Sequence, residues 1–222
     1  MQIELKKRII TSFFLFFLLI FIYIYSYIMI ISLIIIITIS WIEFYSLFSK
    51  IFSNKDLKNK FFKFLFKALS LIYLSTLLYF ILNIESQNMH LKIYLFYSIL
   101  VSIASDIGGL IIGKIFKGRK LTKISPKKTI SGAIGSFIFS LILVPLFIKS
   151  MPDYEIITLL FITIFISLIS QIGDLFISLL KRKAKVKDTS DLLPGHGGVL
   201  DRIDGMIFAI PAGLLLFNFM QR

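Results

Sequence analysis

The stretch from Ile9 to Ile42 reads IITSFFLFFLLIFIYIYSYIMIISLIIIITISWI and contains no charged residue. A helix needs roughly 20 apolar residues to cross a hydrocarbon core of about 30 Å. At about 1.5 Å per residue, one helix over the whole stretch would measure about 51 Å, too long for a single upright crossing. The stretch therefore predicts two membrane-spanning helices, Ile9–Tyr25 and Tyr27–Phe48, joined by a tight turn near Ser26.

A cleaved signal peptide is the alternative for the first helix, because Lys6, Lys7 and Arg8 resemble the charged region that opens such peptides. Two features argue against it. The apolar run is too long, and no small-residue cleavage site follows it. We therefore expect this segment to remain in the protein as a span.

Further apolar segments follow along the chain, at Leu65–Ile84, Leu91–Gly113, Ile130–Ile148, Glu155–Leu180 and Val199–Met220. The 222 residues are 57% hydrophobic, whereas soluble domains contain about 45–50% apolar residues. The gaps between segments are too short to bury a separate soluble core, and the absence of cysteine excludes disulfide and thiol chemistry. We predict an all-α, polytopic helical bundle of about seven transmembrane helices. Residues 1–90 form an N-terminal region of about three helices, and residues 91–222 form a catalytic region with basic loops.

The net charge of +13 is concentrated beside the predicted spans. Of the 25 lysines and arginines, 21 lie before the first span or in the segments Lys50–Lys67, Lys114–Lys128 and Lys181–Lys187. Seven crossings put all four regions on one side, so the positive-inside rule predicts a cytoplasmic N-terminus. The aromatic residues lie mostly inside the spans, so we expect basic loops that attract anionic lipid and no nucleic-acid partner.

Four aspartates lie in the cytoplasmic halves of the predicted spans: Asp106, Asp174, Asp201 and Asp204. Ionisable groups at such depths are costly and point to function. Clustered carboxylates need cations to stay ionised, either lysine and arginine or a divalent metal, and hard oxygen ligands suit Mg²⁺. A structural ion-pair network, for example with Arg202, is the alternative. Because Asp201 and Asp204 are three residues apart, we expect them to share one helix face.

Two further polar features lie at span ends. Glu43, near the cytoplasmic end of its span, is interpreted as structural, with its carboxylate reaching the interface. The run Ser125-Pro126-Lys127-Lys128-Thr129 precedes a span, and its capping residue, exposed N–H groups and two lysines make an anion site. A topogenic loop with an ordinary N-cap explains the same residues, and the sequence leaves both interpretations open.

The segment from Ser178 to Asp204 reads SLLKRKAKVKDTSDLLPGHGGVLDRID. It combines a basic cluster that can neutralise phosphate, a glycine turn and a carboxylate pair. It resembles the phosphatidate cytidylyltransferase (CDP-diglyceride synthase) family pattern of Ser-x-aliphatic-Lys-Arg, then Lys-Asp-x-small, then His-Gly-Gly-x-x-Asp-Arg-x-Asp. Every fixed position is matched, with Ser190 as the small residue. The resemblance extends upstream through Gly173-Asp174, the Ser125–Thr129 run and Asp106-Ile107-Gly108-Gly109.

The resemblance implies a multi-pass enzyme of the bacterial inner membrane, with its active site facing the cytoplasm. Such an enzyme transfers the cytidylyl group of CTP to phosphatidate, giving CDP-diacylglycerol and pyrophosphate. The resemblance further implies that Asp174, Asp201 and Asp204 act at an Mg²⁺ centre, and it leaves a second cation open. The resemblance also implies that Lys181 and Arg182 are catalytic and that the protein forms a homodimer. The implied substrate contacts are Ser125, Lys127, Lys128, Ser178, Lys187, Asp188, His196, Gly197, Gly198 and Arg202. His196 suits either a general base or a turn residue bonded to the backbone.

The chain departs from the family pattern in two ways, and other functions would need features that it lacks. Ser131 stands where the family usually carries a glutamate, and the chain is shorter than typical members, so we expect the spans that it lacks to be peripheral. A CTP-dependent polyprenol or dolichol kinase would share CTP but not the complete Ser178–Asp204 pattern. A CDP-alcohol phosphotransferase would need an Asp-Gly-x-x-Ala-Arg run, which is absent. A cation-coupled transporter explains the aspartates but not the basic, glycine-containing loop.

Overall fold

The computed structural model of the protein describes residues 2–53, 56–87, 89–122, 125–195 and 197–220. Apart from isolated bridges, the regular secondary structure of the described residues is entirely helical, which confirms the predicted all-α class. The elements in chain order are α1 (Gln2–Ile24), α2 (Ser26–Ile51), α3 (Leu57–Gln87), α4 (Met89–Phe116), α5 (Ile130–Leu141), α6 (Val144–Phe147), a 3₁₀ turn η1 (Ile148–Ser150), α7 (Ile156–Lys183), α8 (Leu200–Ile203) and α9 (Met206–Met220).

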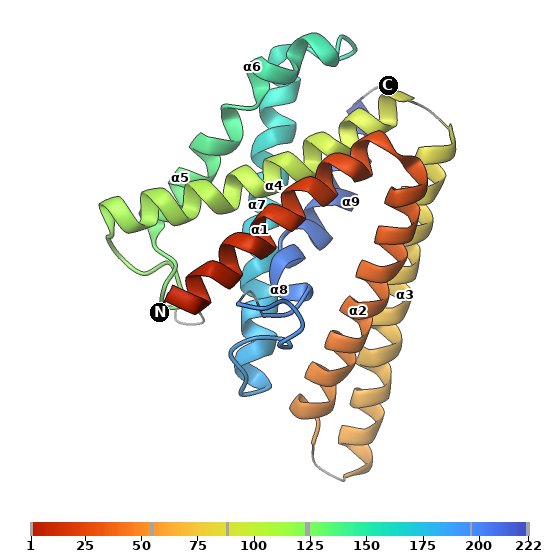
Figure 1. The fold of residues 1–222 in the computed structure, drawn as a ribbon, viewed down its shortest axis with the longest axis vertical. Coiled ribbons are helices and arrows are strands. Elements are labelled where there is room, and N and C mark those ends of the chain that lie inside the picture. The colour runs from red at the N-terminus through yellow and green to blue at the C-terminus, as the bar shows by residue number, and fades with distance from the viewer. Residues whose placement is uncertain (1, 54–55, 88, 123–124, 196, 221–222) are drawn as a thin grey trace. The chain divides into compact units, whose positions relative to one another are not determined.

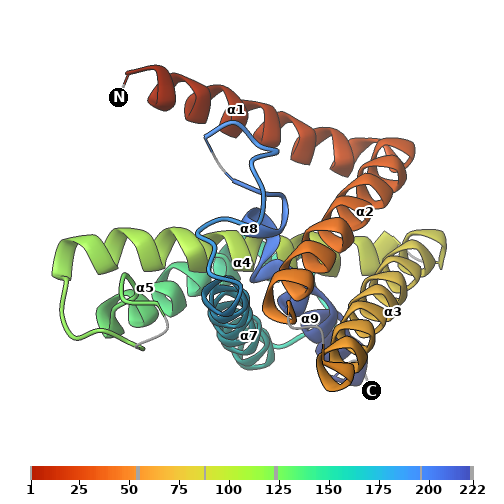
Figure 2. The ribbon, with the colours of Figure 1, turned by 90° about the horizontal axis from the view of Figure 1, so that it is seen from below.

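The predicted turn near Ser26 is confirmed. Helix α1 ends at Ile24, Tyr25 has an extended backbone with φ −116° and ψ 109°, and α2 begins at Ser26. The two helices are separate rods that meet at this residue (Figures 1 and 2). Six helices or helix pairs in the described chain are long and apolar enough to cross a membrane. The apolar part of α1, Phe13–Ile24, is shorter, so a crossing by α1 stays a prediction.

The chain forms two compact units that interleave in sequence. Unit 1 comprises Met1–Ser86 and Leu180–Ile203, and unit 2 comprises Gln87–Leu179 and Asp204–Arg222. In unit 1, α2 contacts both α1 and α8. Its end packs on the start of α3 through aromatic stacking, with ring centroids of Phe48 and Phe66 5.5 Å apart. Unit 1 therefore combines the N-terminal helices with the segment Leu180–Ile203, which is distant in the sequence.

Unit 2 is built on close packing of α4 against α5 and α9. Glycines let the α4 and α5 backbones approach: a Cβ placed on Gly135 would lie 2.4 Å from Cβ of Ile112 and 2.7 Å from the Gly108 carbonyl oxygen. Serines bond across the helices, with Ser136 Oγ donating to the Ser105 carbonyl at 2.7 Å. Small residues and interhelical hydrogen bonds of this kind replace the hydrophobic effect as the packing force in lipid.

Two predicted spans contain breaks that the apolar pattern did not reveal. The Ile130–Ile148 segment is divided into α5, α6 and η1, with a proline in the first turn of α6. The Val199–Met220 segment is divided by a turn at Asp204 and Gly205. The expectation that Asp201 and Asp204 share the face of one helix is therefore wrong, because α8 ends at Ile203 and Asp204 lies in the turn.

Candidate active site

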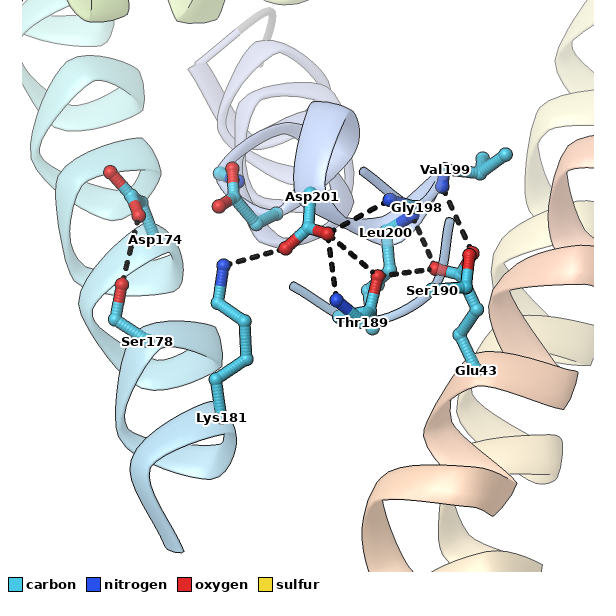
Figure 3. A network of polar contacts seen from close by, with 12 residues as sticks. Glu43, Asp174, Ser178, Lys181, Thr189, Ser190, Gly198, Val199, Leu200 and Asp201 are labelled. Atoms are coloured by element: carbon cyan, nitrogen blue, oxygen red, sulfur yellow. Dashed lines mark hydrogen bonds and ion pairs between the residues drawn. The ribbon is translucent and has the colours of Figure 1, made fainter. Parts of the chain in front are cut away.

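The carboxylate of Asp201 is the centre of a polar network in unit 1 (Figure 3). Its Oδ1 pairs with Nζ of Lys181 at 2.6 Å, from the last turn of α7. Its Oδ2 accepts hydrogen bonds from the Thr189 amide at 2.8 Å and the Gly198 amide at 2.9 Å, and it lies 2.9 Å from the Thr189 hydroxyl oxygen. Only 4% of the Asp201 side chain is exposed, so these donors, together with the lysine, replace the water that an ionised carboxylate needs.

The glycines of the predicted turn are required by close contacts in this network. Gly197 has φ +80°, and a Cβ there would lie 2.8 Å from Oδ2 of Asp201. A Cβ on Gly198 would lie 2.0 Å from the Thr189 hydroxyl and 2.5 Å from Oε1 of Glu43. Only glycine lets the backbone approach the carboxylates this closely. In the structure these glycines lie against side chains of the protein itself, and their predicted contact with substrate stays a prediction.

The sequence predicts that Glu43 is structural, with its carboxylate at the membrane interface; the interface position is wrong, because the residue is buried. Its side chain belongs to α2, is only 3% exposed, and accepts hydrogen bonds from the segment that carries Asp201. One feature of the sequence could have indicated a role for Glu43, namely that its carboxylate lies inside an apolar run. Its partners lie about 150 residues further along the chain, as the separations of 146 to 157 residues show.

A second acid–base pair lies in unit 2. Nζ of Lys128 pairs with Oδ2 of Asp174, and the hydroxyl of Ser178, one turn further along α7, donates to Oδ1 at 3.3 Å. The lysine and aspartate side chains are 26% and 25% exposed, so the pair is more open than the Asp201 network. Lys128, Asp174 and Ser178, which belong to separate motifs in the sequence, therefore lie together in the structure.

The loop before α5 is held in shape by its own backbone. The Lys128 amide donates to the Ser125 carbonyl at 3.0 Å, and the Leu121 amide donates to the Lys128 carbonyl at 2.8 Å. Thr129 is the N-cap of α5, and its hydroxyl accepts the Gly132 amide at 3.1 Å. The predicted cap is confirmed. The loop presents Lys128 to Asp174, which a purely topogenic loop would not require.

Ser131, at the position where the family usually carries a glutamate, turns back toward the preceding loop. Its hydroxyl donates to the Lys117 carbonyl and lies 3.0 Å from the Thr129 hydroxyl.

The other predicted site residues differ in how far they are exposed. Asp204 is buried in its turn, and its Oδ1 accepts the Gly205 amide at 2.9 Å. The remaining charged side chains of the predicted site are exposed: Lys127, Arg182, Lys187, Asp188 and Arg202. Ser125 is half-buried in the loop before α5. His196 lies outside the described residues. Because Asp174 and Asp201 belong to different units, their joint action at one centre stays a prediction.

Fold and site together define an all-α, multi-pass membrane protein whose lysine-paired aspartates lie in or at the ends of its spans. The lysines in these pairs are suited to an anionic ligand, because each ammonium group has three N–H donors and its carboxylate uses only part of that capacity. The chain belongs to the cytidylyltransferase family, whose family model matches residues 2–220.

Among its curated relatives is a phosphatidate cytidylyltransferase of Bacillus subtilis (strain 168), 38% identical over 149 residues, which are 66% of this chain and 55% of that protein. A phosphatidate cytidylyltransferase of Rickettsia prowazekii (strain Madrid E) is 44% identical over 139 residues, 59% of each chain. A third, from Staphylococcus saprophyticus, is 39% identical over 149 residues, 66% of this chain and 56% of that protein. The chain therefore spans little more than half the length of the relatives that it matches.

Proposed function

We propose that the protein transfers the cytidylyl group of CTP to phosphatidate, forming CDP-diacylglycerol and releasing pyrophosphate. The observation that carries this proposal is the pairing of Lys181 with Asp201 and of Lys128 with Asp174, each in a motif of the resembled family. The family membership and the names of the three relatives support it. Phosphatidate, CTP and pyrophosphate are all anions, and a site for them requires fixed, oriented cations.

In the proposed reaction, a phosphate oxygen of phosphatidate attacks the α-phosphorus of CTP. The new P–O bond forms as the bond between the α-phosphorus and the oxygen bridging to the β-phosphate breaks, and pyrophosphate leaves with that electron pair. The nucleophile is already an anion, so no general base is required. The barrier comes from repulsion between two anions and from charge that grows on the leaving group. Lysines held at fixed positions reduce both.

The two aspartates would keep these lysines ionised and oriented. Asp201 is almost fully enclosed, and each of its oxygens already has partners, so its main role would be to hold Lys181 and the loop 189–198. Lys128 lies in the more open pair and is the better placed to contact a phosphate oxygen. We further propose that the exposed Arg182, Lys187 and Arg202 contact the triphosphate or the lipid phosphate.

Mg²⁺ is the metal that the resemblance implies, and the residues around Asp174 fit it. In the described residues, no three histidine, cysteine, aspartate or glutamate side chains form a ligand group. Mg²⁺ does not need such a cage, because it usually binds one or two carboxylates together with water and substrate phosphates. The partly exposed Asp174 is the carboxylate that we propose as its first protein ligand, with Asp204 and Asp201 as further candidates, and Asp201 would have to release one of its present partners to bind the metal. When bound, the metal would neutralise charge on the triphosphate.

The proposed location is the bacterial inner membrane, with the basic loops and the site on the cytoplasmic side. CTP would then arrive from the cytosol and phosphatidate from the adjoining leaflet, so the depth of the aspartates matches the meeting point of the two substrates. A homodimer stays a prediction from the family resemblance.

The test is an assay of purified protein with phosphatidate and CTP, with and without a chelator. We expect label in the cytidine of CTP to enter the lipid, and we expect the chelator to abolish this incorporation. Label that enters the lipid only from the γ-phosphate would identify a lipid kinase instead. Ion flux in proteoliposomes without CTP turnover would identify a transporter. Either result would overturn the proposed reaction.

A further inference from the structure

We propose that Glu43 of α2 is a positioning residue that fixes the loop carrying Asp201 in its working conformation. The inference rests on the proposed function for its effect on catalysis, but the contacts that carry it lie wholly within unit 1. The sequence motifs of the C-terminal half do not include Glu43, which lies 158 positions before Asp201 in the numbering of the chain.

The carboxylate of Glu43 accepts four hydrogen bonds from this loop. Oε1 accepts the Ser190 hydroxyl at 2.6 Å and the Val199 amide at 3.0 Å. Oε2 accepts the Thr189 hydroxyl at 2.8 Å and the Leu200 amide at 2.8 Å. Each oxygen thus takes one hydroxyl and one backbone amide, and together they hold both ends of the segment 189–200. All four donors are neutral, so Glu43 holds the loop by accepting hydrogen bonds and not by pairing with a charged group.

Thr189 connects Glu43 to Asp201 directly. Its hydroxyl oxygen lies 2.8 Å from Oε2 of Glu43 and 2.9 Å from Oδ2 of Asp201, and its amide donates to the same Asp201 oxygen at 2.8 Å. Figure 3 shows this bridge between the helix and the loop. Because Asp201 also pairs with Lys181 at 2.6 Å, a displacement of Thr189 would be passed on to the lysine. The chain of contacts runs from Glu43 through Thr189 and Asp201 to Lys181.

Close packing makes the contact specific for a carboxylate of this length. A Cβ on Gly198 would lie 2.5 Å and 2.6 Å from the two Glu43 oxygens, so the loop backbone lies directly against the carboxylate. Aspartate is one methylene shorter and would not reach the same donors. Glutamine has the right length but replaces one accepting oxygen with an NH₂ group, and each oxygen here faces a backbone amide donor. An N–H facing an N–H leaves a buried donor unsatisfied.

The decisive variants are Glu43→Gln, Thr189→Val and Thr189→Ser, with Glu155→Gln as the matched control because Glu155 is exposed in unit 2. Displacement of a catalytic group by about 1 Å can cost about 10²-fold in rate. We expect Glu43→Gln and Thr189→Val to lower kcat by about this factor, while KM for CTP changes much less. Thr189→Ser keeps the bridging hydroxyl and should restore most of kcat. Glu155→Gln should match the parent protein.

Folding is measured separately, by gel filtration in detergent and by thermal unfolding of each variant. Wild-type kcat in Glu43→Gln would overturn the proposal. So would a loss of activity that only follows the loss of folded protein, or a Thr189→Ser variant no better than Thr189→Val.

Hydrogen exchange gives a readout that does not depend on the reaction. The amides of Val199 and Leu200 should be protected in the parent protein and in Glu155→Gln, and should exchange faster in Glu43→Gln. Unchanged protection in Glu43→Gln would overturn the positioning role. If the parent protein makes no CDP-diacylglycerol but Glu43→Gln still loses protection, the proposed reaction fails and the holding of the loop by Glu43 is supported.

Discussion

Single residues determine how this protein keeps charge inside a membrane. Asp201 is nearly enclosed, yet its two oxygens have a lysine, two amides and a hydroxyl around them. A buried carboxylate without such partners would be unstable as an anion. Removal of one partner is therefore expected to cost more than the loss of a surface ion pair.

The variant Asp201→Asn tests whether the partners of this buried carboxylate are needed. An amide cannot accept from Lys181 on one side and from two backbone amides on the other, because only its oxygen is an acceptor. We expect the variant to insert into the membrane normally and to lose Mg²⁺-dependent formation of CDP-diacylglycerol. The measurement is product formation by purified protein, normalised to the folded fraction from gel filtration. Near-full activity would contradict the assignment of Asp201.

The residues of the C-terminal motif could be predicted from the sequence because their types and spacing are distinctive. Lys181, Asp201 and the two glycines after His196 lie within a short segment, and the structure brings the lysine, the aspartate and both glycines into one network. Glu43 could not be predicted in the same way. Hydropathy assigns a carboxylate near a span end to the interface, and nothing local to α2 indicates that its partners are in the Thr189–Leu200 segment.

The existence of the helices could be predicted better than their continuity. The turn at Tyr25 follows from length alone, because one helix would have been too long for the bilayer. The breaks after Leu141 and at Asp204 were not predicted, because each segment as a whole is apolar enough for a span, although Pro145 lies near the first break and the Asp204-Gly205 pair forms the second. Hydropathy records which side chains prefer lipid, whereas a break depends on the backbone hydrogen bonds of a few residues. In lipid those bonds must be satisfied by neighbouring protein.

The α4–α5 contact supports a prediction about packing. In Gly135→Ala, the new methyl group would lie 2.4 Å from Cβ of Ile112 and 2.7 Å from the Gly108 carbonyl oxygen, and a helix backbone cannot easily move away. We expect destabilisation of about 1–3 kcal/mol, as for other overpacked sites. Unfolding of the purified protein in mixed detergent measures it. Ile138→Ala is the control, because that side chain is 51% exposed on α5. Equal stability of the two variants would refute the close contact.

At the scale of the whole molecule, the distribution of basic residues predicts the orientation in the membrane. The segments with most lysines and arginines alternate with short, weakly charged loops, and the seven predicted crossings would place them all on the cytoplasmic side. The predicted orientation depends on the charge counts and on the number of spans, so no single helix determines it.

Cysteine labelling tests the orientation directly, because the chain has no native cysteine. Lys60→Cys and Lys149→Cys place single thiols at exposed positions in the regions predicted to be cytoplasmic and external. In intact spheroplasts, a membrane-impermeant maleimide should label Lys149→Cys at once and Lys60→Cys only after permeabilisation. The reverse pattern would invert the topology, and immediate labelling of both would show that a span has been miscounted.

The link between α2 and the loop after α7 also has a consequence for biosynthesis. Glu43 is translated 146 residues before Thr189, which at about 5–20 residues per second corresponds to a delay of about 7 to 30 s. Throughout that delay the nascent helix has a glutamate whose four eventual donors do not yet exist. The membrane insertion machinery must therefore tolerate this carboxylate until the ribosome delivers its partners.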